Sequence, residues 1–323
     1  MISGVAQDKI VLRLGTVAPE ETPWGEWMKA WRDSVNQQCE NRLQLKIFFG
    51  GTLGGENTMV RRCQAGMLDL FGGSTAAIAE IVPELNVLEL PYLFENSEEA
   101  DFIIDHYLHL EIEKIFEKNG LKLLLWTENG WRSMATQFGP VQKPEDLAGH
   151  KMRSQENWVH LETYKALGAS PVPISVPEVL SSLQTGVVDG FDNTPLFSFA
   201  ASWYQGIQYY SLTEHIYQPA IVMCNLKKFK DLPASLQRPM LQGREQWQKK
   251  GRQGVRELTP LLLENFVQAG KKVVALSPAE KKYFSQKSEK VYAQFKASAS
   301  SEVLALLIRV EEGKKVYRTR RSD

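Results

Sequence analysis

The sequence predicts an α/β protein with two lobes, and three observations lead to this expectation. The chain has 323 residues, which at roughly 100–200 residues per domain corresponds to about two domains. Strand and helix patterns alternate in two series, one before and one after Leu125. No linker rich in Pro, Gly or Ser separates the series, so we expect strands and helices, rather than a tether, to cross between the lobes.

The first series has a regular strand and helix alternation. Apolar residues alternate over 10–14 and 43–49, which predicts two strands, and residues 68–71 predict a third short strand. Helical spacing of apolar residues predicts helices over 24–35 and 57–65. This β-α-β-α-β order favours a parallel sheet with right-handed crossovers.

The second series follows a long helix predicted over 98–117. Two separate strands are expected at 121–126 and 132–138. The later elements that we expect are a helix over 158–167, strands over 187–191 and 220–224, and a helical stretch from 233 to 275 broken near Pro260.

These elements divide the chain into lobes, each with a sheet of its own. We place lobe one at 1–126 plus 218–255 and lobe two at 127–217 plus 256–300. The crossings are expected near Trp126 and Gln218, and the tail, 301–323, is expected to pack across both lobes.

Composition excludes several classes of protein. The 38 basic and 38 acidic residues cancel, whereas nucleic-acid binding needs a concentrated basic face. The one basic run, 314–321, is interpreted as a solvated end. No apolar run reaches the ~18 residues that span a bilayer. Residues 1–8 lack the segments of a signal peptide, which fits a cytoplasmic protein or a mature exported one.

No catalytic or metal-binding motif emerges. The sequence contains no G-x-S-x-G elbow, Walker A motif, G-x-G-x-x-G or H-E-x-x-H. His106 and His109 have a spacing that could hold a metal, but no third ligand is near, and a solvated helix face is favoured. Cys39, Cys63 and Cys224 match no zinc pattern; Cys39 and Cys63 could pair, but three buried apolar residues are the preferred interpretation. We expect no enzyme activity, cofactor or metal.

The informative block lies between Leu147 and Pro195. Its pieces are Gly149-His150-Lys151-Met152-Arg153, Gly168-Ala169-Ser170-Pro171-Val172-Pro173, and the stretch from Pro177 to Pro195 that contains Gln184-Thr185-Gly186-Val187-Val188-Asp189-Gly190 and Asp192-Asn193-Thr194-Pro195. In order and spacing this block resembles the substrate-binding subunits, of the DctP type, of tripartite ATP-independent periplasmic (TRAP) transporters. Earlier landmarks agree in register, among them Val17-Ala18-Pro19, Leu53-Gly54-Gly55-Glu56 and Leu90-Pro91-Tyr92-Leu93-Phe94.

The resemblance covers about 10–235 and implies a two-lobed periplasmic-binding, or Venus-flytrap, fold with long helices that span the hinge. It also implies that Arg153 forms a two-pronged pair with a ligand carboxylate in the floor of the cleft. A guanidinium is planar and permanently charged, and its parallel donors match carboxylate oxygens. Without the motif, a surface ion pair would be the default interpretation of this arginine.

Two further residues match motif positions. Arg132 corresponds to a second arginine that supports the same ligand, and its alternative is a charged strand edge. Asn193 corresponds to the motif asparagine and can donate and accept hydrogen bonds, although a turn residue before Thr194-Pro195 is the alternative.

Departures from the family pattern suggest a less polar cleft. The family's R-V-P is Arg153-Ser154-Gln155 here, and Phe191 is an added aromatic residue. We predict that Trp158 and Phe191 form walls, together with Val17 after the first strand and the Ser74–Ala77 segment after the third. Trp24, Trp27 and Trp31 form a helical stripe that favours the core.

The resemblance predicts a solute-binding protein that closes on a small organic acid, a monocarboxylate with a largely apolar body, and delivers it to TRAP permease subunits in the membrane. The mature form is expected in the periplasm, with a lipid anchor left open. A lipid-like ligand carried with a tetratricopeptide-repeat partner is one alternative, and a sensor without transport is another. A cation bridging the ligand to Asp192 is disfavoured.

Overall fold

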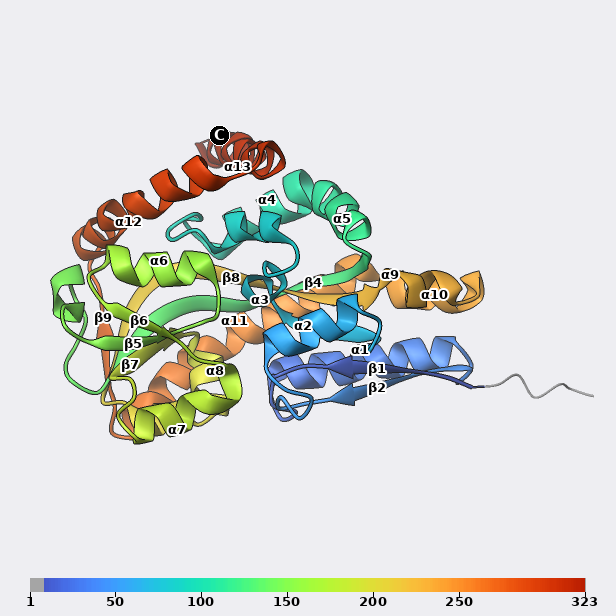
Figure 1. Ribbon diagram of the computed structural model, residues 1–323, viewed down its shortest axis with the longest axis horizontal. Helices are drawn as coiled ribbons and strands as arrows, with labels where there is room; N and C mark the ends of the chain where they lie inside the picture. The colour runs from blue at the N-terminus through green and yellow to red at the C-terminus, as the bar shows by residue number, and fades with distance from the viewer. Residues whose placement is uncertain (1–8, 323) are drawn as a thin grey trace, which may run out of the picture.

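The computed structural model describes residues 9–322, and the expectations about residues 1–8 lie outside this range. The chain folds into two lobes that share one mixed sheet (Figure 1). The strands follow the order β2-β1-β3-β8-β4-β7-β5-β6, with β9 added beside β8. No helix within the described range has the length and apolar character that crossing a membrane requires.

The first lobe is built on the predicted β-α-β-α-β series. Parallel strands β1, β2 and β3 pair in register, and helices connect them. The elements of this part are β1 (Ile10–Gly15), α1 (Pro23–Gln38), β2 (Leu43–Phe48), α2 (Glu56–Gln64), β3 (Leu70–Ser74), α3 (Thr75–Ile78), the 3₁₀ helix η1 (Pro83–Glu89), α4 (Ser97–Ile103), the π-helical turn η2 (Ile104–Leu108) and α5 (His109–Lys118). The predicted helix over 98–117 is thus interrupted by the π-helical turn.

The second lobe repeats the alternation with shorter elements. They are η3 (Pro144–Leu147), β5 (Lys151–Ser154), α6 (Trp158–Ala166), β6 (Ser170–Pro173), η4 (Val176–Glu178), α7 (Val179–Gln184), β7 (Gly190–Asn193), α8 (Pro195–Ala200) and η5 (Trp203–Gly206). Strands β6, β5 and β7 are parallel, and β7 joins β4 in antiparallel fashion.

Two long antiparallel strands connect the lobes, β4 (Leu121–Thr136) and β8 (Tyr209–Asn225). One end of β8 pairs with β3, and the far end of β4 pairs with β7. The expectation of two separate sheets is therefore wrong, because each long strand supplies one end to each lobe and keeps its hydrogen bonds through the crossing. The predicted strands 121–126 and 132–138 are parts of one strand.

The crossing itself is irregular. The register between β4 and β8 shifts between Glu128 and Gly130 and again between Arg132 and Met134. Gly130 has a φ of +101°, a conformation that L-residues with a side chain rarely adopt. Such bulges bend a strand and re-aim its side chains, so the crossing is both the hinge region and a source of cleft residues.

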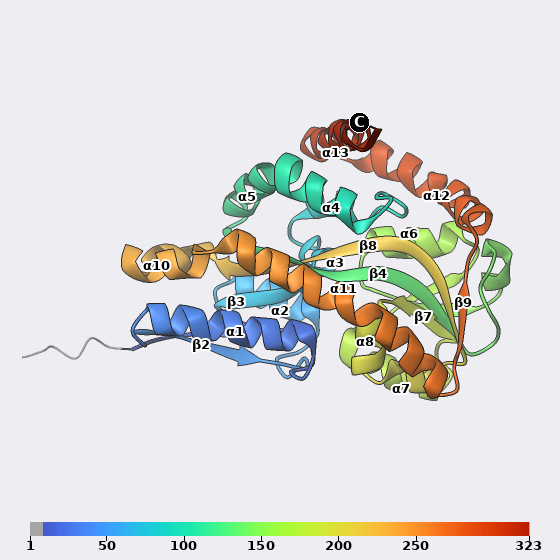
Figure 2. The same cartoon turned by 180° about the vertical axis from the view of Figure 1, so that it is seen from behind.

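Long helices brace the crossing from outside. After α9 (Leu226–Asp231) and α10 (Ala234–Leu241), helix α11 (Arg244–Gln268) runs behind both lobes, from α1 past β4 to α8 and β9 (Lys272–Ala275) (Figure 2). The break predicted near Pro260 is wrong, since Pro260 lies inside α11. The interruption falls instead at Gly243, whose φ is +68°.

The C-terminal helices form an arch over the molecule (Figure 1). Helix α12 (Pro278–Ser298) packs on α6, and α13 (Ser301–Ser322) packs mainly on η1, α4 and η2. The expected packing of the tail across both lobes therefore does not match these contacts. The tail packs on first-lobe elements because Val303, Leu306, Leu307 and Val310 join the hydrophobic core there.

Candidate ligand-binding cleft

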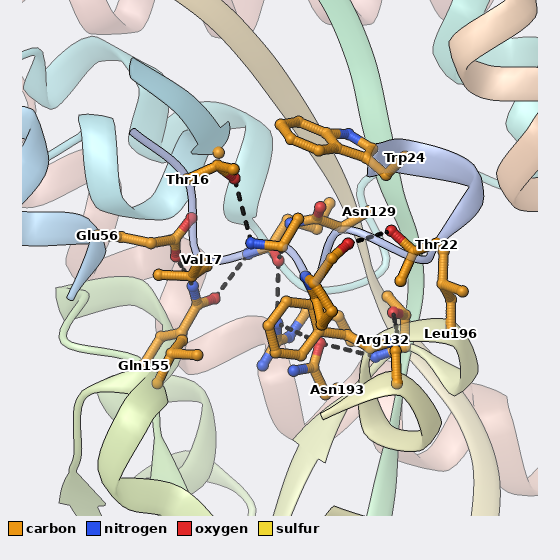
Figure 3. A pocket seen from close by; sticks show the side chains of 18 of the residues that line it. Thr16, Val17, Thr22, Trp24, Glu56, Asn129, Arg132, Gln155, Asn193 and Leu196 are labelled. Atoms are coloured by element: carbon orange, nitrogen blue, oxygen red, sulfur yellow. Dashed lines mark hydrogen bonds between the residues drawn. The ribbon is translucent and has the colours of Figure 1, made fainter. Parts of the chain in front are cut away.

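A cavity of about 590 Å³ lies between the lobes, at the crossing strands. Its walls come from the loop after β1, the start of α2, the β4 and β8 crossing, the end of β5, and the segment from β7 into α8. Figure 3 shows Thr16 and Trp24 at the top of the view, Glu56, Val17 and Gln155 at the left, and Arg132 and Asn193 below the centre.

Arg153 lines this cavity and has a donor that is left unpaired among the described residues. It lies in β5 with 1% of its surface exposed, and its Nε donates to the backbone oxygen of Ile174 at 3.0 Å. Its Nη1 is buried without a hydrogen-bond partner among the described residues. Burial, and then the charge of Arg132, lower the pKa of Arg153 to about 10, although Asp192 and Glu56 act in the opposite direction. The group is therefore cationic at neutral pH.

The ring of Trp203, which lies in the second lobe like Arg153, packs against the guanidinium group of Arg153. The guanidinium carbon lies 5.1 Å from that ring's centroid, a favourable cation–π arrangement. Phe191 is the register partner of Arg153 in β7 and packs edge-on against Trp203, with ring centroids 5.2 Å apart. The side chain is thereby positioned by its surroundings before any ligand arrives.

Arg132 lies in the same cavity but its donors are engaged by the protein. Its Nε contacts Asp192 Oδ2 at 2.6 Å, and Nη2 donates to the Asp192 carbonyl at 2.6 Å. Its Nη1 donates to Asn193 Oδ1 at 3.2 Å and to Gln218 Oε1 at 2.9 Å. Arg132 therefore holds the site together, while Asn193 lines the cavity beside it.

The charge on Asp192 is kept by its neighbours. Burial by itself raises the pKa of this carboxyl, but Arg132 and His215 outweigh burial and hold the pKa well below its ordinary value. His215 Nε2 lies 3.4 Å from Asp192 Oδ2, and the Tyr164 hydroxyl donates to Oδ1 at 2.9 Å. The Arg132–Asp192 ion pair is thus buried beside the cavity, and further hydrogen bonds hold both side chains in place.

Among the polar cleft residues that the sequence analysis missed are three that bond to one another, Glu56, Gln155 and Gln218. Glu56 begins α2 and accepts hydrogen bonds from the Ser74 backbone and hydroxyl, both at 2.8 Å. Gln155 donates to Glu56 Oε2 at 3.2 Å and accepts from Gln218 Nε2 at 2.7 Å. The Leu53–Glu56 landmark pointed to Glu56, and the departure from the family pattern pointed to Gln155. For Gln218 the sequence offered only its predicted position where the chain crosses between the lobes.

The other predicted wall residues have different positions. Val17 lines the cavity. Phe191 has no exposed surface and lies in the second-lobe core, and Trp158 is 39% exposed at the start of α6 and does not line the cavity. Trp24 is buried, as its helical stripe predicts, and lines the cavity too.

The Ser74–Ala77 segment is divided between two surroundings. Ser74 is buried under Glu56, and Ala77 lines a neighbouring cavity of about 240 Å³. Of the five residues predicted as walls, Phe191 does not line the main cavity because β7 packs its ring into the core, and Trp158 does not because the start of α6 faces outward.

Metal ligands do not gather in the described part of the chain, where no group of three His, Cys, Asp or Glu side chains is close enough to hold an ion. Cys39, Cys63 and Cys224 are free and buried, as the preferred interpretation has it.

Comparison with known proteins agrees with this geometry. A sequence profile of the bacterial extracellular solute-binding proteins of family 7 matches residues 14–298. A solute-binding protein of Verminephrobacter eiseniae is 31% identical over 78% of this chain and 75% of its own length.

Two solved structures share the whole fold. A TRAP periplasmic solute-binding protein of Chromohalobacter salexigens with bound D-glucuronate is 25% identical, with a TM-score of 0.89 over 94% of this chain and 99% of that one. One of a Polaromonas species bound to D-erythronate is 27% identical, with a TM-score of 0.87 over 93% and 98%.

Fold and cleft define a two-lobed solute-binding protein, a class that captures its ligand and does not transform it. The chain belongs to family 7 of the bacterial extracellular solute-binding proteins. It is therefore a binding protein of the TRAP type and not an enzyme.

Proposed function

We propose that this protein captures a small organic acid between its lobes, outside the cytoplasm, and delivers it to the membrane permease subunits of a TRAP transporter. The observation that carries the proposal is Arg153, a buried cation that lines the cavity and whose Nη1 has no hydrogen-bond partner among the described residues. A carboxylate would supply the missing anion with matching geometry. Its burial is tolerable only with such a charge-matched partner.

The remaining walls suggest the character of the ligand's body. Glu56, Gln155 and Asn129 offer polar groups, whereas Val17, Trp24, Val176, Leu196 and Phe197 offer apolar surface. We therefore propose an acid with at least one hydroxyl or oxo group and an apolar face. This revises the expected largely apolar body, since two of its expected walls, Trp158 and Phe191, lie elsewhere.

The relatives support an acid as the ligand class, because the two structures described above hold D-glucuronate and D-erythronate. A lipid-like ligand carried with a tetratricopeptide-repeat partner would call for a lining without the buried Arg153 and Glu56, and no observation favours it. A periplasmic location, with or without a lipid anchor, is part of the proposal and follows from the family.

Calorimetric titration of D-erythronate and D-glucuronate into wild-type protein and Arg153 variants tests the proposal. Arg153→Ala is expected to weaken binding by about 30- to 5000-fold, because losing one member of a buried charge pair costs roughly 2–5 kcal/mol. Arg153→Lys should recover only part, since an ammonium cannot reproduce the planar fork.

Two controls separate loss of binding from loss of fold. Arg309→Ala, which removes an exposed pair with Glu111, should bind like the wild type. Arg153→Ala should melt no lower than the wild type without ligand, because it removes a buried cation that lacks an anion. Wild-type affinity in Arg153→Ala would contradict the proposed anchor.

A further inference from the structure

Glu56 is a buried carboxyl group in the wall of the main cavity. It begins α2 with 7% of its surface exposed, and Figure 3 shows it beside Gln155. Its Oε1 accepts from the Ser74 backbone N–H and its Oε2 from the Ser74 hydroxyl, both at 2.8 Å. The Gln155 amide donates to Oε2 at 3.2 Å. None of these donors carries a charge, so they hold Glu56 in place without neutralising it.

The other charges of the cavity lining show what a ligand meets. The lining contains two acidic and two basic residues, Glu56, Glu128, Arg132 and Arg153. Arg132 pairs with Asp192, and Glu128 pairs with Arg256, each at 2.6 Å. In the part of the chain that the structure describes, the contacts of Glu56 and of Arg153 Nε are with uncharged groups. One cation and one carboxyl group of the lining are thus left without an ion-pair partner there.

The hydrogen bonds behind Glu56 have a direction that begins at Arg132. A guanidinium can only donate, so Gln218 presents Oε1 to Arg132 Nη1, at 2.9 Å. The amide nitrogen of Gln218 therefore donates to Gln155 Oε1 at 2.7 Å. This orientation leaves the amide nitrogen of Gln155 to donate to Glu56. Glu56 lies at the accepting end of this chain of amides.

The Ser74 hydroxyl is fixed as a donor in the same way. Its oxygen accepts from the Ala77 N–H at 3.2 Å and from Gln155 Nε2 at 3.1 Å, which occupies both lone pairs. Its hydrogen is therefore left for Glu56 Oε2. A proton on Oε2 would face two donors, so these contacts require Oε2 to accept.

The ionised form of Glu56 suits this arrangement at neutral pH. Burial raises the pKa of this carboxyl above its ordinary value, although the Ser74 donors and then Arg153 act in the opposite direction. Hydrogen bonds donated to a carboxylate favour its charged form. Three donors converge on Glu56, and we therefore take it to be a carboxylate when the ligand binds.

Such a carboxylate discriminates between ligand groups by charge. Oε1 accepts one of the described hydrogen bonds, so it can accept another from a ligand hydroxyl. A ligand carboxylate at neutral pH has no hydrogen to donate and carries a like charge, which is costly at a desolvated site. Once the first carboxylate of a diacid has neutralised Arg153, the lining offers no second unpaired cation among its described residues.

The geometry points to Glu56 as the residue that selects the ligand by charge: it admits hydroxy acids whose single carboxylate binds Arg153 and excludes diacids with the same carbon chain. The inference rests on the proposed function, because it takes Arg153 as the anchor. It adds a residue that rejects a second carboxylate without limiting the length of the ligand.

Two acids of equal chain length test this selection by calorimetry at neutral pH. D-erythronate and meso-tartrate share their carbon chain and inner hydroxyls, and differ only at the far end, where a CH₂OH group is replaced by a carboxylate. The wild-type protein should bind D-erythronate more tightly by about tenfold or more, because a like charge placed in a desolvated site costs several kcal/mol.

Removal of the charge should reverse the effect. In Glu56→Gln the affinity for meso-tartrate should rise, and the ratio of the two affinities should move toward the diacid by about tenfold or more. Glu56→Ala, which places no amide hydrogens next to the Gln155 amide, should move the ratio in the same direction. A gain of affinity for one acid is not what damage to the fold would produce, since damage weakens both.

A matched control changes a buried carboxyl outside the cavity. Glu99 in α4 is fully buried, accepts from the Glu95 N–H at 2.7 Å and does not line the cavity. Glu99→Gln should therefore keep the wild-type ratio of affinities. Thermal melting of each variant establishes that it is folded.

The outcomes separate this inference from the proposed function. A wild-type protein that binds meso-tartrate as tightly as D-erythronate would overturn the charge selection, even if no Glu56 variant folds. An equal loss of affinity for both acids in the Glu56 variants would overturn it too. Retained binding of D-erythronate in Arg153→Ala would instead overturn the anchor of the proposed function. Binding of neither acid by the wild type would contradict both proposals.

Discussion

At the scale of single residues, the cleft uses its two arginines in different ways. Arg132 donates hydrogen bonds to Asp192, Asn193 and Gln218. Arg153, in contrast, has an Nη1 without a hydrogen-bond partner among the described residues. The first organises the site and the second is left for an anion. The two buried cations can lie close together because Asp192 neutralises the charge of Arg132. We propose that a ligand carboxylate neutralises the charge of Arg153.

The Arg132–Asp192 pair should give the protein a distinct dependence on pH. Since the pKa of Asp192 is held well below its ordinary value, the pair stabilises the fold fully above about pH 4, the unfolded value, and loses this effect as the pH falls toward the folded pKa. Asp192→Asn should lower the free energy of unfolding by roughly 3–5 kcal/mol at neutral pH. Chemical denaturation at several pH values measures this, and the difference between the two proteins should narrow below about pH 4.

The exposed Asp33, which pairs with the neighbouring Arg32, supplies the matched control. Asp33→Asn should change the free energy of unfolding by no more than about 0.5 kcal/mol. A gap between wild type and Asp192→Asn that stays constant down to about pH 3 would show that the pair's charge is not what stabilises this region.

At the scale of elements, the crossing strands are tied to the helices behind them. Glu128 in β4 is 1% exposed and receives two donors from Arg256 in α11, the closest at 2.6 Å, as well as the Tyr217 hydroxyl of β8 at 2.6 Å. Arg256 also contacts Asp101 in α4 at 2.8 Å. Strands β4 and β8, helix α11 and helix α4 therefore meet at one ionic group beside the hinge.

Breaking this group should destabilise the fold by leaving Glu128 buried and unpaired. Burial already raises the pKa of Glu128 despite Arg256. Arg256→Met should cost roughly 2–3 kcal/mol in urea denaturation, below the 3–5 kcal/mol typical of fully buried pairs, because Arg256 is 28% exposed. The double variant Arg256→Met with Glu128→Gln should recover part of the loss, whereas additive losses would mean that the two side chains are not coupled.

At the scale of the whole molecule, the cleft is closed by direct bonds between lobes. Asn57 Nδ2 donates to the Glu156 oxygen at 3.3 Å, and Asn157 Nδ2 donates to the Ala76 oxygen at 3.0 Å. Together with the Gln155 contacts, these bonds link the two lobes beside the site. An arginine without an anion opposes this closed arrangement, so we expect the ligand-free protein to open about the β4 and β8 crossing.

Small-angle X-ray scattering tests this expectation. A saturating acid, such as D-erythronate, should lower the radius of gyration, because closure brings the lobes together around the ligand. Arg153→Ala in the same acid should keep the radius of the ligand-free protein. An unchanged radius in the wild type, with binding established by calorimetry, would indicate a cleft that stays closed.

Much of the architecture was predictable because it rests on local patterns. Apolar alternation and helical spacing indicated the first β-α-β-α-β series, the absence of a linker indicated crossing strands, and the motif order around Arg153 indicated a family and an anchor. These signals lie in neighbouring residues, so a single sequence carries them.

Tertiary structure alone decided which side chains share the cleft. Phe191 and Asn193 lie two residues apart in β7, yet one packs in the core and the other lines the cavity. Glu56, Gln155 and Gln218 are 63 to 162 residues apart and meet only because the lobes close. The two expected strands of 121–138 become one because β8 continues its pairing past the hinge. Pairing between distant segments leaves no periodic trace in the sequence, and the partners of a buried polar group depend on the folded arrangement of the whole chain.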